Sequence, residues 1–130
     1  MPAYEGRPFE PPAPVARVCL RNPETGMALQ DVPMLIDSGA DVSLVPLASV
    51  NRLGVATDSS MGYELMGFDG SRSVSRVVRL DLLFLGRAFK GQFLLIDQEW
   101  GFLGRDVLKH LAILLHGPQS NWSEHPIGNE

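Results

Sequence analysis

The chain has 130 residues, of which 45% are hydrophobic and 20% are charged, and its formal net charge is −4. These values suit one compact domain with a modest core, and the mixed charge contains no basic stripe for a nucleic-acid partner. A single cysteine, Cys19, excludes an intrachain disulfide, and we predict a reducing, cytoplasmic setting. His110, His116 and His125 show no metal-ligand spacing, so we expect no metal and no cofactor.

The chain begins with a proline-rich segment, Met1 to Ala16, which lacks the charged start and apolar run of a secretory signal peptide. We predict a poorly ordered arm over residues 1–14, a folded domain over 15–125 and a short tail over 126–130. The longest apolar run, Leu111 to Leu115, is much shorter than the roughly 20 residues that span a bilayer. We therefore expect no membrane partner.

Strand and turn signals alternate in the first part of the folded domain. Val15 to Leu20 alternates loosely in polarity, and residues 22–26 are typical turn residues, which predicts a hairpin with a return strand at Met27 to Gln30. Val32 to Ile36 is apolar enough for a strand that is buried on both faces. Asp37 therefore lies where a buried strand ends.

The middle of the chain combines one helical signal with a hairpin signal. Apolar residues between Ser43 and Leu53 have approximately helical spacing, which favours one or two helical turns before Gly54. Tyr63 to Met66 and Ser73 to Leu80 are expected strands, and the Asp-Gly pair between them is a strong hairpin-turn signal.

The last part of the chain predicts two more strands, Val78 to Phe84 and Phe89 to Ile96, then a short helix at Val107 to Leu111 and one further strand. Many short strands, frequent turns and little helix indicate an all-β fold with one or two short helices. We predict a small, mostly antiparallel, closed or barrel-like β domain.

The strand that ends at Asp37 continues into Asp37-Ser38-Gly39-Ala40. Taken alone, these residues are equally well explained as an ordinary turn. They resemble the active-site signature of aspartic proteases, in which an acid is followed by Ser or Thr and then by Gly. In such a site two carboxyl groups share one proton, so that one acts as the base toward water and the other as the acid. Gly39 would allow a tight turn, and the Ser38 hydroxyl could hold the loop.

A second motif, Phe102 to Leu108, resembles the retropepsin segment of two apolar residues, Gly, Arg, Asn or Asp, and a helix. The order and the separation of the two motifs match that family, which implies a barrel-like, retropepsin-like half of an acid protease. The resemblance also implies a structural ion pair between Asp41 and Arg105, because the planar guanidinium can bind a carboxylate at two points. The alternative is a surface arginine at the start of a helix.

Between the two motifs, the resemblance places a flap that closes over bound substrate, at Met66, Gly67, Phe68, Asp69 and Gly70. The glycines give the backbone freedom, and the apolar side chains could cover a substrate side chain. This hairpin departs from many retroviral flaps, which are richer in Gly and Ile. An ordinary exposed hairpin explains the same residues.

Only Asp37 has the sequence context of the signature, because Asp58 is followed by two serines and Asp69 precedes a glycine directly. The resemblance therefore implies a homodimer that hydrolyses a peptide or protein substrate through an Asp37 dyad, one acid from each copy. The terminal strands, with Trp122, are candidates for the dimer interface; alternatively, Trp122 covers the edge of its own domain.

Two alternatives to an endopeptidase remain. One is a catalytically silent retropepsin-like domain that dimerises or binds peptides in its groove. The other is an unrelated β-barrel binding module with chance motifs, which predicts that Arg105 lies far from Asp41 and that Asp37 has no symmetric partner.

Overall fold

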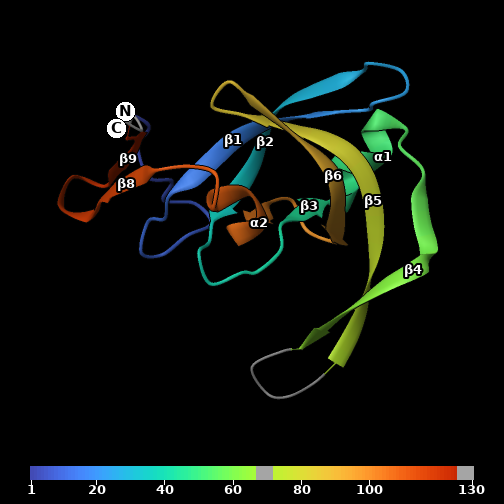
Figure 1. Cartoon of the computed structure of the whole chain (residues 1–130). Coiled ribbons are helices and arrows are strands. Elements are labelled where there is room, and N and C mark those ends of the chain that lie inside the picture. The colour runs from blue at the N-terminus through green and yellow to red at the C-terminus, as the bar shows by residue number, and fades with distance from the viewer. Residues whose placement is uncertain (67–71, 126–130) are drawn as a thin grey trace.

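One sheet runs through most of the chain and closes on itself (Figure 1). Its order is β1-β2-β7-β3-β6-β5-β4, and β5 also pairs with β1. This last pairing closes a barrel of six strands and leaves β4 outside it, paired with β5. The strands are β1 (Val15–Arg21), β2 (Ala28–Ile36), β3 (Leu44–Pro46), β4 (Thr57–Met66), β5 (Arg72–Phe84), β6 (Arg87–Ile96) and β7 (Gly101–Leu103).

This computed structural model of the single chain describes residues 1–66 and 72–125. The side chains of residues 58–75 are not described. Two short helices, α1 (Leu47–Leu53) and α2 (Arg105–Leu108), accompany the sheet, and a second sheet holds β8 (Ile113–His116) and β9 (Asn121–Glu124), joined by the 3-10 turn η1 (Gly117–Gln119). The expected all-β fold with short helices in a closed barrel is confirmed.

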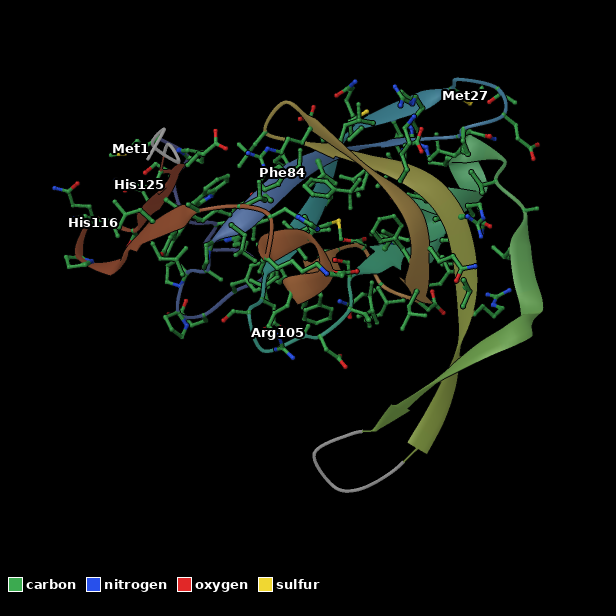
Figure 2. The ribbon with its side chains drawn as sticks, viewed as in Figure 1. Met1, Met27, Phe84, Arg105, His116 and His125 are labelled. Atoms are coloured by element: carbon green, nitrogen blue, oxygen red, sulfur yellow. The ribbon has the colours of Figure 1, made fainter. Side chains whose placement is uncertain are left out.

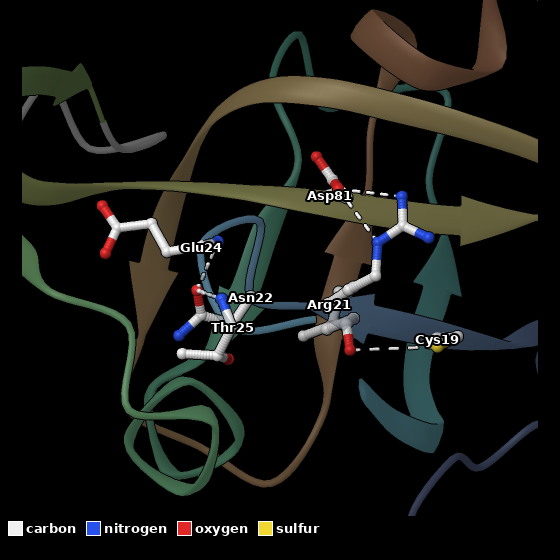
Figure 3. Close-up of polar contacts among 7 residues, drawn as sticks. Cys19, Arg21, Asn22, Glu24, Thr25 and Asp81 are labelled. Carbon is white, nitrogen blue, oxygen red and sulfur yellow. Dashed lines mark hydrogen bonds and ion pairs between the residues drawn. The ribbon is translucent and has the colours of Figure 1, made fainter. Parts of the chain in front are cut away.

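The hairpin of β1 and β2 turns at Asn22, as the turn residues of the sequence predict. The Asn22 side-chain oxygen accepts hydrogen bonds from the backbone N–H groups of Glu24 (2.9 Å) and Thr25 (3.4 Å), as Figure 3 shows. Its amide nitrogen donates to the carbonyl oxygen of Leu53 at the end of α1. Asn22 is buried, so these bonds satisfy a polar group that would otherwise be costly to enclose.

An ion pair supports the closure of the barrel between β1 and β5. Arg21 Nε and Nη2 both donate to Asp81 Oδ2, at 3.0 and 2.9 Å, and the two residues face each other in the pairing of the strands (Figure 3). Asp81 is buried, and the arginine provides the hydrogen bonds that its carboxylate needs there.

The core lies inside the barrel and consists of apolar side chains from nearly every strand. The largest fully buried side chains are those of Leu20, Met34, Leu80, Leu82 and Leu103. Trp122 of β9 is also buried, with its ring centroid 5.8 Å from that of Phe84. Within the single chain, Trp122 therefore covers the edge of its own domain.

Several elements differ from their expected bounds. The two strands expected at Ser73 to Leu80 and Val78 to Phe84 form one continuous strand, β5. The segment expected to be helical from Ser43 is a short strand, β3, up to Pro46, and only then the helix α1. Pro46 explains the order, because its fixed φ and missing N–H exclude it from a helix interior but suit the position before the first turn.

The first residues of the chain lie along the β8–β9 hairpin. Trp122 N donates to the carbonyl of Pro2, and Tyr4 N donates to the carbonyl of Ser120. Glu5 pairs with Ala13 through two backbone hydrogen bonds, so the segment between them forms a loop. The division into an arm over 1–14, a domain over 15–125 and a tail over 126–130 stays a prediction.

Candidate active site

Asp37, the candidate acid, lies directly after β2, in a loop that the backbone itself shapes. Its N–H donates to the carbonyl of Leu103 at 3.0 Å, which continues the parallel pairing of β2 with β7 by one step. Its Oδ1 accepts a hydrogen bond from Gly39 N at 2.9 Å, and its carbonyl accepts one from Ala40 N at 3.2 Å. The carboxyl group is therefore held at one oxygen, on a half-buried residue beside two exposed ones, Ser38 and Gly39.

Glycine at position 39 suits this geometry. A Cβ there would lie 3.1 Å from Asp37 Oδ1, which is tight enough that the carboxyl group would have to shift slightly. The tight turn expected at Gly39 brings its amide to that carboxylate. The Ser38 carbonyl oxygen accepts a hydrogen bond from Arg105. A hydrogen bond from the Ser38 hydroxyl that holds the loop stays a prediction.

Arg105 ties the start of α2 to this loop at two points. Its backbone N–H donates to the carbonyl of Ala40 at 2.8 Å, and its Nη1 donates to the carbonyl of Ser38 at 2.6 Å. Figure 2 shows the Arg105 side chain extending from α2 toward the side on which the loop after β2 lies.

The expected pair of Asp41 with Arg105 is not among the ion pairs that the structure shows for the described residues, which join Arg17 to Glu5 and Arg21 to Asp81. In the single chain, the guanidinium is directed to a backbone carbonyl instead. Asp41 and Arg105 are both exposed, so water competes with a carboxylate for this cation.

A buried contact that the sequence did not predict holds the C-terminal end of the same loop. Ser43, which is fully buried, donates its backbone N–H to Asp106 Oδ2 at 3.0 Å and its hydroxyl to Asp106 Oδ1 at 2.7 Å. The hydroxyl oxygen of Ser43 also accepts a hydrogen bond from Gly104 N at 2.9 Å. The available signal was a hydroxyl residue three positions after the first motif and an acid in the second.

Gly104 allows the two motifs to touch. A Cβ on Gly104 would lie 2.6 Å from the carbonyl oxygen of Val42 and 2.9 Å from that of Ala40, so no other residue fits without moving the backbone. Together with Ser43–Asp106 and Arg105–Ser38, this close approach fastens the loop of Asp37 to α2 from both sides. The loop is therefore held by its own hydrogen bonds and by the start of α2.

An apolar groove of about 190 Å³ lies beside the loop. It is lined by Ile36, Ser38, Leu108, Leu111, Ile113 and Leu115. Leu115 of β8, which lines this groove, is 50% exposed, which marks its face as a candidate contact surface.

The remaining predicted site residues belong to the expected flap. Gly67, Phe68, Asp69 and Gly70 lie outside the described residues, and Met66 is the last residue of β4, with its side chain undescribed. The strands that lead to them, β4 and β5, pair at Thr57 and Asp58 and again from Tyr63 opposite Ser75 to Met66 opposite Arg72, with a shift of register between the two stretches. Figure 1 shows this ribbon projecting away from the barrel.

In the part of the chain that the structure describes, no group of three or more His, Cys, Asp or Glu residues could hold a metal ion. Among the same residues, none of the helices has the length and apolar character that crossing a membrane requires.

No protein-family model matches the chain. It is similar to the Pol polyproteins of equine infectious anemia virus, from strain Wyoming and isolates 1369 and CL22, with 32% identity over 98 residues. The match covers 73% of this chain but only 8% of each polyprotein, so the chain spans a small part of these curated relatives.

Among solved structures, the chain is similar to EIAV protease complexed with an inhibitor, with a TM-score of 0.56 and 23% identity. That alignment covers 82% of this chain and 91% of the protease. The chain therefore has the fold of the retropepsin-like aspartic proteases, and its resemblance to that family, first inferred from two short motifs, is confirmed.

Proposed function

We propose that the chain is a homodimeric aspartic endopeptidase in which Asp37 of each copy contributes one carboxyl group. The observation that carries this proposal is the fastening of the Asp37 loop to α2 on both sides, through Ser38–Arg105 and Ser43–Asp106, within a retropepsin-like fold. A loop that must only turn the chain does not need such support, whereas a reacting carboxylate needs a fixed position.

The chemistry requires two carboxyl groups with different protonation states. The ionised Asp37 removes a proton from a water molecule held between the two acids, and the water oxygen attacks the peptide carbonyl carbon. The protonated Asp37 of the other copy donates its proton to the carbonyl oxygen. When the tetrahedral intermediate collapses, the C–N bond breaks, the departing nitrogen takes the proton that the first Asp37 removed from water, and a hydroxyl of the intermediate returns a proton to the other Asp37. Two carboxyl groups about 3 Å apart cannot both ionise easily, which makes proton sharing the stable state.

The second carboxyl group has to come from a second copy, since Asp37 is the only acid in this sequence context. The exposed Leu115 and the apolar groove that it lines support a surface that a second copy covers. Because an isologous interface repeats the same patch on both copies, a patch next to Asp37 brings the two acids toward the two-fold axis.

Three further parts of the proposal rest on the family resemblance or on composition. We place the flap over the substrate at residues 66–70, carried by β4 and β5. We keep an Asp41–Arg105 ion pair as a feature of the assembled dimer, and a cytoplasmic location because the sequence has one cysteine.

The test compares cleavage of a diverse peptide pool by the wild type, Asp37→Asn and Asp31→Asn, from mildly acidic to neutral pH. Asp31 is exposed in the middle of β2 and makes no contact with the loop of Asp37, so Asp31→Asn is a matched control for losing one carboxylate. Asp37→Asn should abolish cleavage, and the control should retain it. At low protein concentration, the wild-type rate should rise more steeply than linearly with concentration, because only the dimer is active.

Equal cleavage by the wild type and Asp37→Asn would refute the mechanism. Absence of cleavage by every form, together with an intact dimer that binds peptides, would favour the catalytically silent alternative.

A further inference from the structure

The strand β6 has one edge that is only partly paired. Along one side it pairs with β5, from Arg87 opposite Phe84 to Leu94 opposite Val77. Along its other side it pairs with β3 over Leu94 to Ile96 alone. In the described part of the chain, no strand pairs with this second edge from Arg87 to Phe93, which is the stretch of β6 nearest the β5–β6 turn in Figure 1.

The direction of the backbone groups on this edge follows from one hydrogen bond. Leu94 N donates to the carbonyl of Ser43 at 3.2 Å, on the side away from β5. In an antiparallel pair, successive residues direct their N–H and C=O groups alternately toward the partner and away from it. Gln92, Lys90 and Ala88 therefore present their backbone groups on the same edge as Leu94, and all three are exposed.

This edge borders a groove of about 680 Å³, the far wall of which is α2 and the turn after it. Phe93 and Val107 line it and are almost fully buried. One end is closed by contacts across it: Arg87 Nη1 donates to the carbonyl of His110, and the rings of Phe89 and His110 lie 5.9 Å apart. The groove thus combines a row of available backbone groups with an apolar base, which is what an added strand needs.

The side chains around the groove give it a positive character. Arg87 and Lys90 line it, and Arg87 keeps further N–H donors besides the one bonded to His110. The acid in the lining, Asp106, already accepts hydrogen bonds from Ser43 and from Val107 N. Within a chain of net charge −4, this groove is therefore suited to an acidic ligand.

We propose that the free edge of β6 is a docking site for an extended, acidic segment of a partner protein. The segment adds as a strand to β6 beyond the end that Arg87 and Phe89 close against His110, with its backbone paired to Lys90 and Gln92 and its carboxylates near Lys90. A second copy of this chain does not fit the same edge, because pairing β6 with itself would bring these cations face to face. Asp37 is not among the residues that line the groove, so a docked segment leaves the candidate acid uncovered.

The test measures binding of labelled peptides to the Asp37→Asn protein by fluorescence anisotropy, which removes any effect of cleavage. The peptides are an alternating Val-Glu sequence and its Val-Lys counterpart. The Val-Glu peptide should bind, and the Val-Lys peptide should bind at least about tenfold more weakly, equivalent to about 1.4 kcal/mol. Lys90→Glu should weaken Val-Glu binding by a similar factor. The control is Lys109→Glu, at an exposed residue outside the groove lining, which should change the affinity for Val-Glu by no more than about twofold.

Strand addition is tested on the peptide, which avoids any risk of unfolding the protein. Two forms of the Val-Glu peptide are N-methylated at alternate residues, one form on each edge of the extended chain. Only the form that is methylated on the edge facing β6 should lose binding. Backbone amide shifts in NMR spectra should concentrate at Lys90 and Gln92. Equal binding by both methylated forms, equal binding of Val-Glu and Val-Lys, or shifts confined to another surface would each overturn the proposal.

Discussion

Ser43, which follows the Asp37 motif, and Asp106, in the second motif, are joined by two hydrogen bonds, one from the backbone N–H and one from the hydroxyl of Ser43. Ser43 is fully buried, so both of its donors depend on this one carboxylate. The contact fixes the end of the loop that carries Asp37.

Replacing Asp106 by alanine should lower the free energy of unfolding by about 2–3 kcal/mol, because buried donors of Ser43 lose their partner. Asp97→Ala, at an exposed acid just after β6, is the control and should change it by no more than about 0.5 kcal/mol. Urea titrations monitored by circular dichroism measure both. A similar loss in the two variants would contradict the proposed support of the loop.

Gly104→Ala should destabilise the chain by about 1–3 kcal/mol or more, because its Cβ would collide with two backbone carbonyls, which cannot move independently. Gly91→Ala is a matched control in β6, where a Cβ meets nothing within 4 Å. It should be nearly neutral. Thermal unfolding of the two variants compares them directly, and an unaffected Gly104→Ala protein would show that the close approach of the two motifs is wrong.

Arg105 distinguishes the contact seen in the single chain from the expected ion pair. Arg105→Ala should reduce cleavage at least about tenfold, equivalent to about 1.4 kcal/mol, while changing stability little, because the residue is exposed. If its partner is the Ser38 carbonyl, Asp41→Asn should retain most of the activity. Non-additive losses in the double variant would instead reveal an Asp41–Arg105 pair, which a double-mutant cycle on kcat/KM detects.

Leu115→Glu should prevent dimer formation and abolish cleavage, because it places a charge on the apolar face beside the Asp37 loop. Met27→Glu is the control, at a comparably exposed apolar residue in the turn of the β1–β2 hairpin. Sedimentation velocity gives the assembly state of both. A Leu115→Glu protein that still dimerises and cleaves would move the interface elsewhere.

Local chemistry made much of this fold predictable. The turn at Asn22 is formed by the side chain that the sequence places there, and Asp37 follows the buried strand that ends at Ile36. The helix α1 ends at Gly54 in a left-handed conformation, as the glycine suggested. Each of these features depends on neighbours within a few residues.

The parallel pairings of β2 with β7 and β3 with β6 were not predictable in this way, and neither were the partners of Arg105 and Ser43. An arginine guanidinium can donate hydrogen bonds to a backbone carbonyl or to an exposed carboxylate. The residue type alone therefore does not decide which acceptor it binds. The choice depends on how the backbone of Gly104 passes the loop after Asp37.

The sequence by itself determined where the chain turns, which strand ends at the candidate acid and which family the two motifs resemble, because hydrophobic periodicity and turn propensity act over short distances. Only the tertiary structure decided which groups hold the loop in place and which edge of β6 stays open. Those outcomes depend on close approach between segments about 65 residues apart, which local propensity does not encode.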